Sequence, residues 1–178
     1  MIGASKKERC LAAVQQVGVL EKLAGYSPAV VSTILVGFDI DDSDIDIVCC
    51  YADADEFKTT FETVFSAQQR LFCEKRNSYV IGRFVSSGFQ FEIYASSEPI
   101  EEQNAVRHFN VMRRLSAIGG DKLRQQIKHL KQQGLKTEPA IAALFNFSGD
   151  PYRAVLAIEQ WTDEDLARNL DTGLRMRS

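Results

Sequence analysis

The stretch STILVGFDIDDSDIDI, residues 32–47, ends in two aspartates that are separated by one branched apolar residue. Side chains of a β-strand alternate between its two faces, so a strand here would place Asp44 and Asp46 on one face and Ile45 and Ile47 on the other. Alternate strand residues lie roughly 6.5 Å apart, which lets two carboxylates share one divalent ion or a pair of ions ~4 Å apart. The stretch therefore predicts a cation site on one face of a strand.

Three further aspartates precede this pair, at positions 39, 41 and 42. Carboxylates this close together repel one another, and a bound cation would relieve the repulsion. Aspartate also favours turns, because its side chain bonds to the nearby backbone. On these residues alone, an Asp-rich turn leading into an ordinary edge strand is an equal alternative.

Length and charge restrict the class of protein. The chain has 178 residues, 45% of them hydrophobic, enough to bury the core of one domain or of one and a half. Its net charge of −3 gives no overall attraction to nucleic acid or to an anionic membrane. No apolar stretch approaches the ~20 residues that cross a bilayer, and the N-terminus lacks the apolar run of a signal peptide. We therefore expect no membrane partner, and nucleic acid only through a local patch.

The cysteines lack the spacing of a metal site, and two of them are adjacent in an apolar run. They are Cys10, Cys49, Cys50 and Cys73. This usage is typical of reduced core thiols in a cytoplasmic protein and not of a disulfide framework.

Helix and strand signals alternate over the first half of the chain. Ser5-Lys6-Lys7-Glu8 has the form of a capping box and predicts a helix behind it. The remaining expected elements are a short strand at 29–31, the carboxylate strand at 44–51, a helix at 57–65 behind a capping Asp53, and two strands at 78–85 and 89–95. Glu92 is an unusual carboxylate in the middle of the last, aromatic-rich strand.

From Ser97 onward the pattern is helical. Pro99 sits in the first turn of an expected helix, whose apolar stripe begins at Ala105 and which closes at Gly119-Gly120. A second helix is expected from Asp121 and stops at Gly134. Further helices are expected from Thr137, from Asp150-Pro151 and, as a short one, after Thr162, with a loose tail after Asp171. Strands and a crossover helix followed by helices indicate an α+β chain.

The spacing around the aspartate pair resembles a known signature. Ser32-Thr33, ten residues, and then Asp44-Ile45-Asp46 are similar to the pattern of the polymerase β-like nucleotidyltransferase superfamily. That pattern is a Gly-Ser pair after the first strand, a loop of about this length, and Asp-x-Asp on the second strand. The chain resembles an uncharacterised bacterial branch of this superfamily, in which segments like 103–108 and 134–139 follow the catalytic half.

The resemblance extends to three further residues. Gly37 stands where small members of the superfamily often have a glycine, and Ser43 directly precedes the first aspartate. The superfamily places a third carboxylate on a later strand, and Glu92 matches it by position and neighbourhood. An exposed strand residue paired with a lysine is the alternative interpretation of Glu92.

The resemblance implies a metal-dependent transferase. Asp44, Asp46 and Glu92 would hold two Mg²⁺ or Mn²⁺ ions, and Glu92 would also help to deprotonate the acceptor. Nucleotidyl transfer needs the charge of the α-phosphate neutralised, and hard cations require oxygen ligands such as carboxylates. A nucleoside triphosphate would be the donor, held by Thr33 together with Ser32, with Gly37 and Ser43 beside it.

One residue departs from the signature. Ser32 stands where the superfamily has glycine, whose missing Cβ lets the backbone approach the nucleotide phosphates closely. Thr33 keeps the hydroxyl that the superfamily's serine supplies. The departure favours a second hypothesis, in which the chain is a catalytically inactive member that binds a nucleotide or a protein.

Several other polar residues remain open to two interpretations. His108 and Arg107 follow a helical apolar stripe and could act on a substrate, or could hydrogen-bond and solvate the helix. The basic residues of 121–136 could hold a polyanionic acceptor or form a solvated face. No role follows from the sequence for Lys136 and Glu138.

Together these observations predict a nucleotidyltransferase-like α/β domain over residues 1–97, with a mixed sheet, and a C-terminal all-helical region over 98–178 packed on it. The expected activity is transfer of a nucleoside monophosphate to a hydroxyl on a small molecule or a protein. The base, the acceptor and the oligomeric state do not follow from the sequence.

Overall fold

A computed structural model describes residues 3–175 of the chain. The chain forms two compact units, of which the first holds the residues up to Leu35 together with Ser43–Val106. The second holds Val36–Asp42 and the chain from Arg107 onward. The first unit is α+β and the second is helical, so the predicted fold class is confirmed. The first unit continues to Val106, where the sequence suggested an end at 97, and it excludes the loop 36–42.

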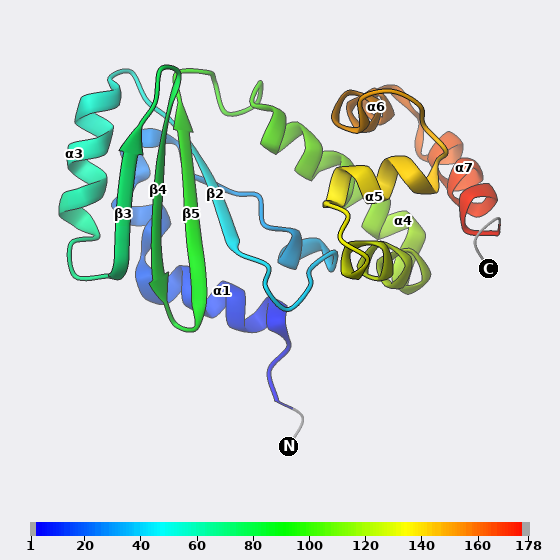
Figure 1. The fold of residues 1–178 in the computed structure, drawn as a ribbon, viewed down its shortest axis with the longest axis horizontal. Coiled ribbons are helices and arrows are strands. Elements are labelled where there is room, and N and C mark those ends of the chain that lie inside the picture. Colours follow the sequence, from blue (N-terminus) through cyan, green and yellow to red (C-terminus); the bar gives the residue numbers. More distant parts are fainter. Residues whose placement is uncertain (1–2, 176–178) are drawn as a thin grey trace. The chain divides into compact units, whose positions relative to one another are not determined.

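A mixed five-stranded sheet forms the centre of the first unit (Figure 1). Its order is β1-β2-β5-β4-β3. The strands are β1 (Ala29–Val30), β2 (Ile45–Cys50), β3 (Gln69–Lys75), β4 (Tyr79–Ser86) and β5 (Phe89–Ser96). β2 runs parallel to β5, and every other neighbouring pair is antiparallel. The two strands predicted to carry the carboxylates are therefore neighbours, although they lie far apart in the sequence.

The two longest helices of the first unit have the predicted caps. α1 (Lys6–Val17) has the expected capping box, in which the Glu8 amide donates to Ser5 Oγ and the Ser5 amide donates to a Glu8 carboxylate oxygen. α3 (Ala54–Val64) is capped by the Asp53 carboxylate. The short helices are α2 (Val19–Lys22), η1 (Ala24–Tyr26) and η2 (Thr33–Val36).

Stacked aromatic rings form the core between α3 and the sheet. The ring centroids of Phe65 and Phe84 lie 4.7 Å apart, and those of Phe84 and Phe91 lie 4.8 Å apart. Phe61 lies over Gly82 of β4, where an added Cβ would come within 2.3 Å of the Phe61 ring. Glycine is required there because the ring occupies the space of a side chain. This buried face leaves the opposite face of the sheet for the carboxylates.

One strand of the sheet was missing from the sequence interpretation. β3 is an edge strand with mostly exposed or half-exposed residues, and Arg70 and Glu74 interrupt its apolar pattern. Charged residues are common on edge strands because they discourage pairing with another chain. Of the residues of β3, Leu71 and Cys73 pack against the core. Two such residues give an alternation of apolar and polar side chains that is too short to predict a strand.

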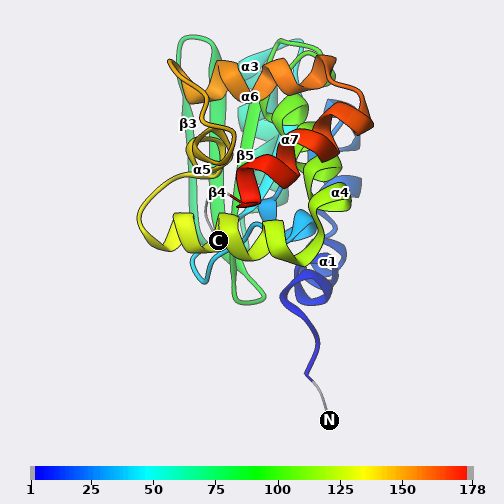
Figure 2. The same ribbon diagram turned by 90° about the vertical axis from the view of Figure 1, so that its right-hand side faces the viewer.

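The second unit is built from four α-helices, seen together in Figure 2. They are α4 (Asn104–Gln132), α5 (Thr137–Leu144), α6 (Pro151–Ala157) and α7 (Asp163–Arg175), with η3 (Ile158–Gln160) between the last two. Gly120, at φ 57° and ψ −151°, interrupts α4 where the sequence predicts a break between two helices. The loose tail predicted after Asp171 is wrong for residues 172–175, since α7 continues to Arg175 and buries Leu174. The rest of that predicted tail lies outside the described residues.

The loop 36–42 belongs to the core of the helical unit. Phe38 is fully buried in the hydrophobic core that residues of the helices of this unit form. Ser116 Oγ donates to the Val36 carbonyl at 2.7 Å, and Lys131 Nζ donates to the Phe38 carbonyl at 2.7 Å. Lys128 pairs with Asp39 at 3.3 Å. Lys128 and Lys131 of α4 thus hold this loop. This role is neither binding of a polyanionic acceptor nor solvation of the helix, the two interpretations that the sequence left open.

Over residues 3–175, none of the helices combines the length and the hydropathy that crossing a bilayer requires.

We predict that Gly82→Ala lowers the free energy of unfolding by about 1–3 kcal/mol, because its Cβ would overlap the buried Phe61 ring. Urea denaturation of the purified variant measures the change. Gly25→Ala is the matched control, since no atom lies within 4 Å of its added Cβ, and it should stay within about 0.5 kcal/mol of the natural protein. Equal stability of the two variants would contradict the packing described here.

Candidate metal and nucleotide site

The three predicted carboxylates lie on one face of two neighbouring strands. Ile45 and Ile47 of β2 are buried in the core of the first unit, so Asp46 points to the opposite face of the sheet. Asp44 precedes β2 directly and continues this alternation. In the parallel pair of β2 and β5, Asp46 is the register partner of Glu92. Register partners share a face, so Glu92 lies on the side of the aspartates, as the metal-site hypothesis requires.

Glu92 is engaged by a cation from the next strand. Arg83 of β4 is its register partner on the other side, and Arg83 Nε donates to a Glu92 carboxylate oxygen at 2.7 Å. The side chains of Arg83 and Glu92 are 41% and 31% exposed. The alternative interpretation of Glu92 was a strand residue that pairs with a lysine. The observed ion pair resembles it, with Arg83 in place of the lysine.

Asp44 also has a polar neighbour from β5. Gln90 Nε2 donates to an Asp44 carboxylate oxygen at 3.0 Å. Gln90 and Glu92 are two residues apart on one strand, so both face the aspartates. The sequence interpretation missed Gln90, although its alternation with Phe89 and Phe91 already placed it on the face of Glu92.

The donor set suits a hard divalent cation. Mg²⁺ and Mn²⁺ prefer carboxylate oxygens, and three carboxylates share one face of β2 and β5. Within residues 3–175, however, no three His, Cys, Asp or Glu side chains are grouped closely enough to hold a metal ion. Glu92 is directed to Arg83. The three carboxylates therefore have the right chemistry for the metal and lie on the same face of the sheet. Glu92 would have to leave Arg83 to bind the metal together with the two aspartates.

Ser32 connects the two halves of the motif, the Ser32-Thr33 pair and the Asp44-Ile45-Asp46 segment. Its side chain is fully buried, and its hydroxyl donates to the Asp44 carbonyl at 2.7 Å. The same oxygen lies 3.4 Å from the Ile34 amide, which donates to it. The predicted phosphate contact through this hydroxyl would compete with the bond to Asp44. Thr33, the first residue of η2, is partly exposed and keeps a hydroxyl for a ligand.

The two other predicted nucleotide contacts lie at the ends of the loop 36–42. Gly37, in the helical unit, has a φ of +75°, and its added Cβ would come within 2.8 Å of Arg124 Cδ. Its glycine therefore has a conformational reason that is independent of any ligand. Ser43 is partly exposed and directly precedes Asp44 in the first unit.

The open questions about Arg107 and His108 have structural answers in the helical unit. Arg107 makes two hydrogen bonds to the Glu159 carboxylate, at 3.2 and 2.6 Å. His108 is buried; its Nε2 lies 3.0 Å from the Tyr152 carbonyl and its Nδ1 lies 3.7 Å from Glu138. Glu138, for which the sequence suggested no role, thus faces a histidine that connects α4 to α6.

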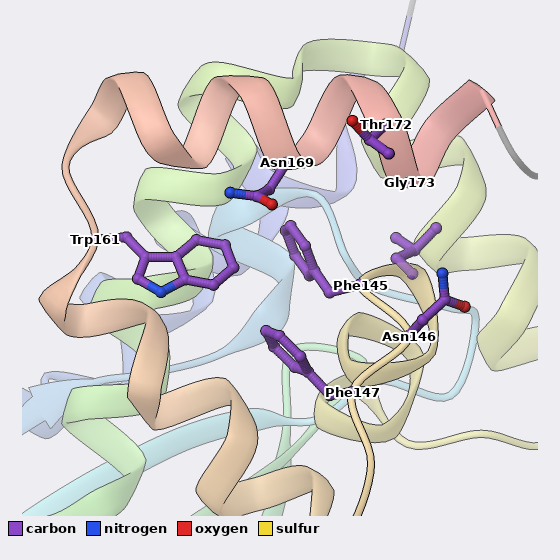
Figure 3. A pocket seen from close by; sticks show the side chains of 8 residues that line it. Phe145, Asn146, Phe147, Trp161, Asn169, Thr172 and Gly173 are labelled. Carbon is purple, nitrogen blue, oxygen red and sulfur yellow. The ribbon is translucent and has the colours of Figure 1, made fainter.

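The helical unit also contains a pocket between α5 and α7 (Figure 3). Its volume is about 190 Å³, and the rings of Phe145, Phe147 and Trp161 lie along one side of it. The ring centroids are 5.4–5.9 Å apart, so the rings pack on one another and leave no space between them for a cation. Asn169, on its rim, donates to the Asp165 carbonyl.

Two of the thiols are too weakly acidic to act as nucleophiles at neutral pH. Burial raises the pKa of Cys49 to about 12 and that of Cys73 to about 11, so both stay protonated. This agrees with the interpretation of these residues as core thiols.

Comparison with solved structures shows the same fold in nucleotidyltransferases. The Cid1 poly(U) polymerase with MgGTP bound has a TM-score of 0.59 at 15% identity, over 88% of this chain and 50% of that one. Cid1 described as an RNA terminal uridylyl transferase has a TM-score of 0.60 at 13% identity, over 88% and 49%. The polymerase core of TRAMP, an RNA surveillance complex, has a TM-score of 0.53 at 13% identity, over 98% and 60%.

These similarities show the fold alone, because the identities are low. The chain spans about half of the length of Cid1. No curated protein matches the sequence. A family model with the description "Domain of unknown function (DUF4269)" matches residues 12–158, most of the chain. The chain therefore belongs to the DUF4269 family, and its fold is that of the nucleotidyltransferases.

Proposed function

We propose that the protein is a metal-dependent nucleotidyltransferase that moves a nucleoside monophosphate from a nucleoside triphosphate to an acceptor hydroxyl. The observation that carries this proposal is the pairing of β2 with β5, which puts Asp46 beside Glu92 on the face that also has Asp44. The nucleotidyltransferase fold supports the same assignment.

The reaction assigns a task to each of these residues. The acceptor oxygen would form a bond to the α-phosphorus, the bond from that phosphorus to the bridging oxygen would break, and pyrophosphate would leave. Glu92 would join Asp44 and Asp46 at the metal and would take the proton of the acceptor hydroxyl. Asp44 and Asp46 would hold Mg²⁺ or Mn²⁺, which supplies positive charge against the α-phosphate when bound. Thr33 would donate its hydroxyl to the triphosphate.

Ser32 has a positioning role in this proposal. Its buried hydroxyl holds the Asp44 carbonyl, so the upstream pair of the motif fixes the backbone that carries the first carboxylate. A glycine at this position could not make that bond. Serine in place of glycine thus fixes the backbone of Asp44. The same substitution adds a Cβ where the phosphates of the nucleotide would approach the backbone.

The acceptor class is open to experiment. The structural neighbours are described as a poly(U) polymerase, an RNA terminal uridylyl transferase and the polymerase core of an RNA surveillance complex. The expectation that nucleic acid would bind only through a local patch rests on the net charge. An RNA 3′-hydroxyl therefore belongs among the acceptors to be tested, beside small hydroxyl compounds and the protein itself.

A catalytically inactive, nucleotide-binding member of the fold is the second candidate. Two observations favour it: Ser32 occupies the glycine position, and Glu92 is paired with Arg83. Such a protein would bind a nucleoside triphosphate with Mg²⁺ and release no pyrophosphate.

We predict that the natural protein releases pyrophosphate from at least one labelled nucleoside triphosphate with Mg²⁺ or Mn²⁺. Asp44→Asn and Asp46→Asn should each lower the rate about 100-fold or more. Each removes a metal ligand, and even the loss of a residue that only orients a metal ligand lowers activity about 10- to 100-fold. A pyrophosphate assay with an RNA oligonucleotide and without it measures the rates.

Asp42→Asn is the matched control for charge, since Asp42 is an exposed aspartate of the same acidic stretch, and its rate should be unchanged. Equal rates in the natural protein and in Asp46→Asn would contradict the transferase. Nucleotide binding without pyrophosphate release would instead support the second candidate.

We predict that Ser32→Ala lowers the free energy of unfolding by about 1–3 kcal/mol, because it removes a buried hydrogen bond to the Asp44 carbonyl. Ser66→Ala, which removes an exposed bond to the Thr63 carbonyl, should cost less than about 0.5 kcal/mol. Chemical denaturation of both variants measures the difference. If Ser32→Ala were as stable as its control, the hydrogen bond from Ser32 to the Asp44 carbonyl would not stabilise the fold.

A further inference from the structure

A row of side chains crosses four strands of the sheet on the carboxylate face. Phe72 of β3 is the register partner of Arg83, Arg83 that of Glu92, and Glu92 that of Asp46. Neighbours in such a row have Cβ atoms about 4.5–5.5 Å apart and interact directly. Glu92 therefore lies between a guanidinium on one side and a carboxylate on the other.

Arg83 is held on both of its sides. It donates to Glu92 at 2.7 Å, and its guanidinium carbon lies 6.0 Å from the ring centroid of Phe72, which is 44% exposed. A guanidinium at this distance from a ring face is attracted by the ring. Phe72 thus keeps the guanidinium within the row and next to Glu92.

The charges of the row decide which neighbour Glu92 approaches. Asp46 repels the Glu92 carboxylate and Arg83 attracts it, so the observed pair is the expected one. A divalent cation at Asp46 would reverse this balance, because it would attract Glu92 toward Asp46 and repel the guanidinium.

We propose that Arg83 is a latch that competes with the divalent cation for Glu92 and thereby lowers the affinity of the site for the metal. The inference rests on the proposed function, because it takes the three carboxylates as the metal ligands. Arg83 is a positioning residue in this account, since it acts through Glu92. Exchange of partners by Glu92 is then part of loading the site.

The latch should have a moderate effect on affinity. Both side chains of the pair are partly exposed, and such pairs contribute little to stability. Without the guanidinium, Glu92 is released and one positive charge is removed from the neighbourhood of the ion. We expect Arg83→Gln to bind Mn²⁺ about fivefold more tightly than the natural protein.

Two matched variants separate the latch from general effects of charge. Arg83→Lys keeps the positive charge beside Glu92 and should bind Mn²⁺ within about twofold of the natural protein. Arg76→Gln removes an arginine that pairs with Glu74 at 2.7 Å at the end of the same sheet. It changes the net charge by the same amount and should leave the affinity unchanged.

The experiment is titration of the full chain with Mn²⁺ alone, followed by electron paramagnetic resonance of the free ion. It compares the natural protein with Arg83→Gln, Arg83→Lys, Arg76→Gln, Asp46→Asn and the double variant Arg83→Gln/Asp46→Asn, after urea denaturation has shown that each is folded. Tighter binding by Arg83→Gln alone, lost when Asp46→Asn is added, supports the latch.

The other outcomes are distinct. Equal or weaker binding by Arg83→Gln, together with weak binding by Asp46→Asn, overturns the latch and leaves the metal site in place. Binding that Asp46→Asn does not weaken places the ion elsewhere, and binding by none of the proteins removes the metal site; either result contradicts the proposed function and the latch together.

Discussion

The parallel pairing of β2 with β5 is the constraint on which the candidate site depends. It joins two strands that are separated in the sequence by a helix and two other strands, and it sets Asp46 opposite Glu92. A slip of this register by one residue would turn Glu92 into the core, because side chains alternate between faces. The buried apolar residues of β5 resist such a slip, since Phe91 and Ile93 pack in the core of the first unit.

The sequence predicts those parts of the fold that have a strong local signal. The capping box of Ser5 and Glu8, the cap at Asp53 and the hairpin of β4 and β5 all rest on local chemistry. β3 was missed because an edge strand carries charges and buries little. The end of α7 was missed because tertiary burial of Leu174, and not local propensity, extends the helix.

The candidate site was predictable in its residues but not in its partners. The alternation around Asp44 and Asp46 predicts their common face, and the resemblance points to Glu92. The bonds from Ser32 to the Asp44 carbonyl and from Arg83 to Glu92 join residues that only the folded chain brings together. The assignment of the loop 36–42 to the helical unit is likewise a long-range result, due to the burial of Phe38 among helices.

The central claim is that a divalent ion binds at the carboxylates on one face of β2 and β5, and paramagnetic broadening tests it most directly. A ¹⁵N-labelled sample of the full chain, titrated with substoichiometric Mn²⁺, reports which backbone amides lie near the ion. The account predicts that the amides of Asp46 and Glu92 broaden first, before those of Asp55 and Asp163 at the acidic starts of α3 and α7. Broadening centred on either helix start, with sharp signals from Asp46 and Glu92, would contradict it.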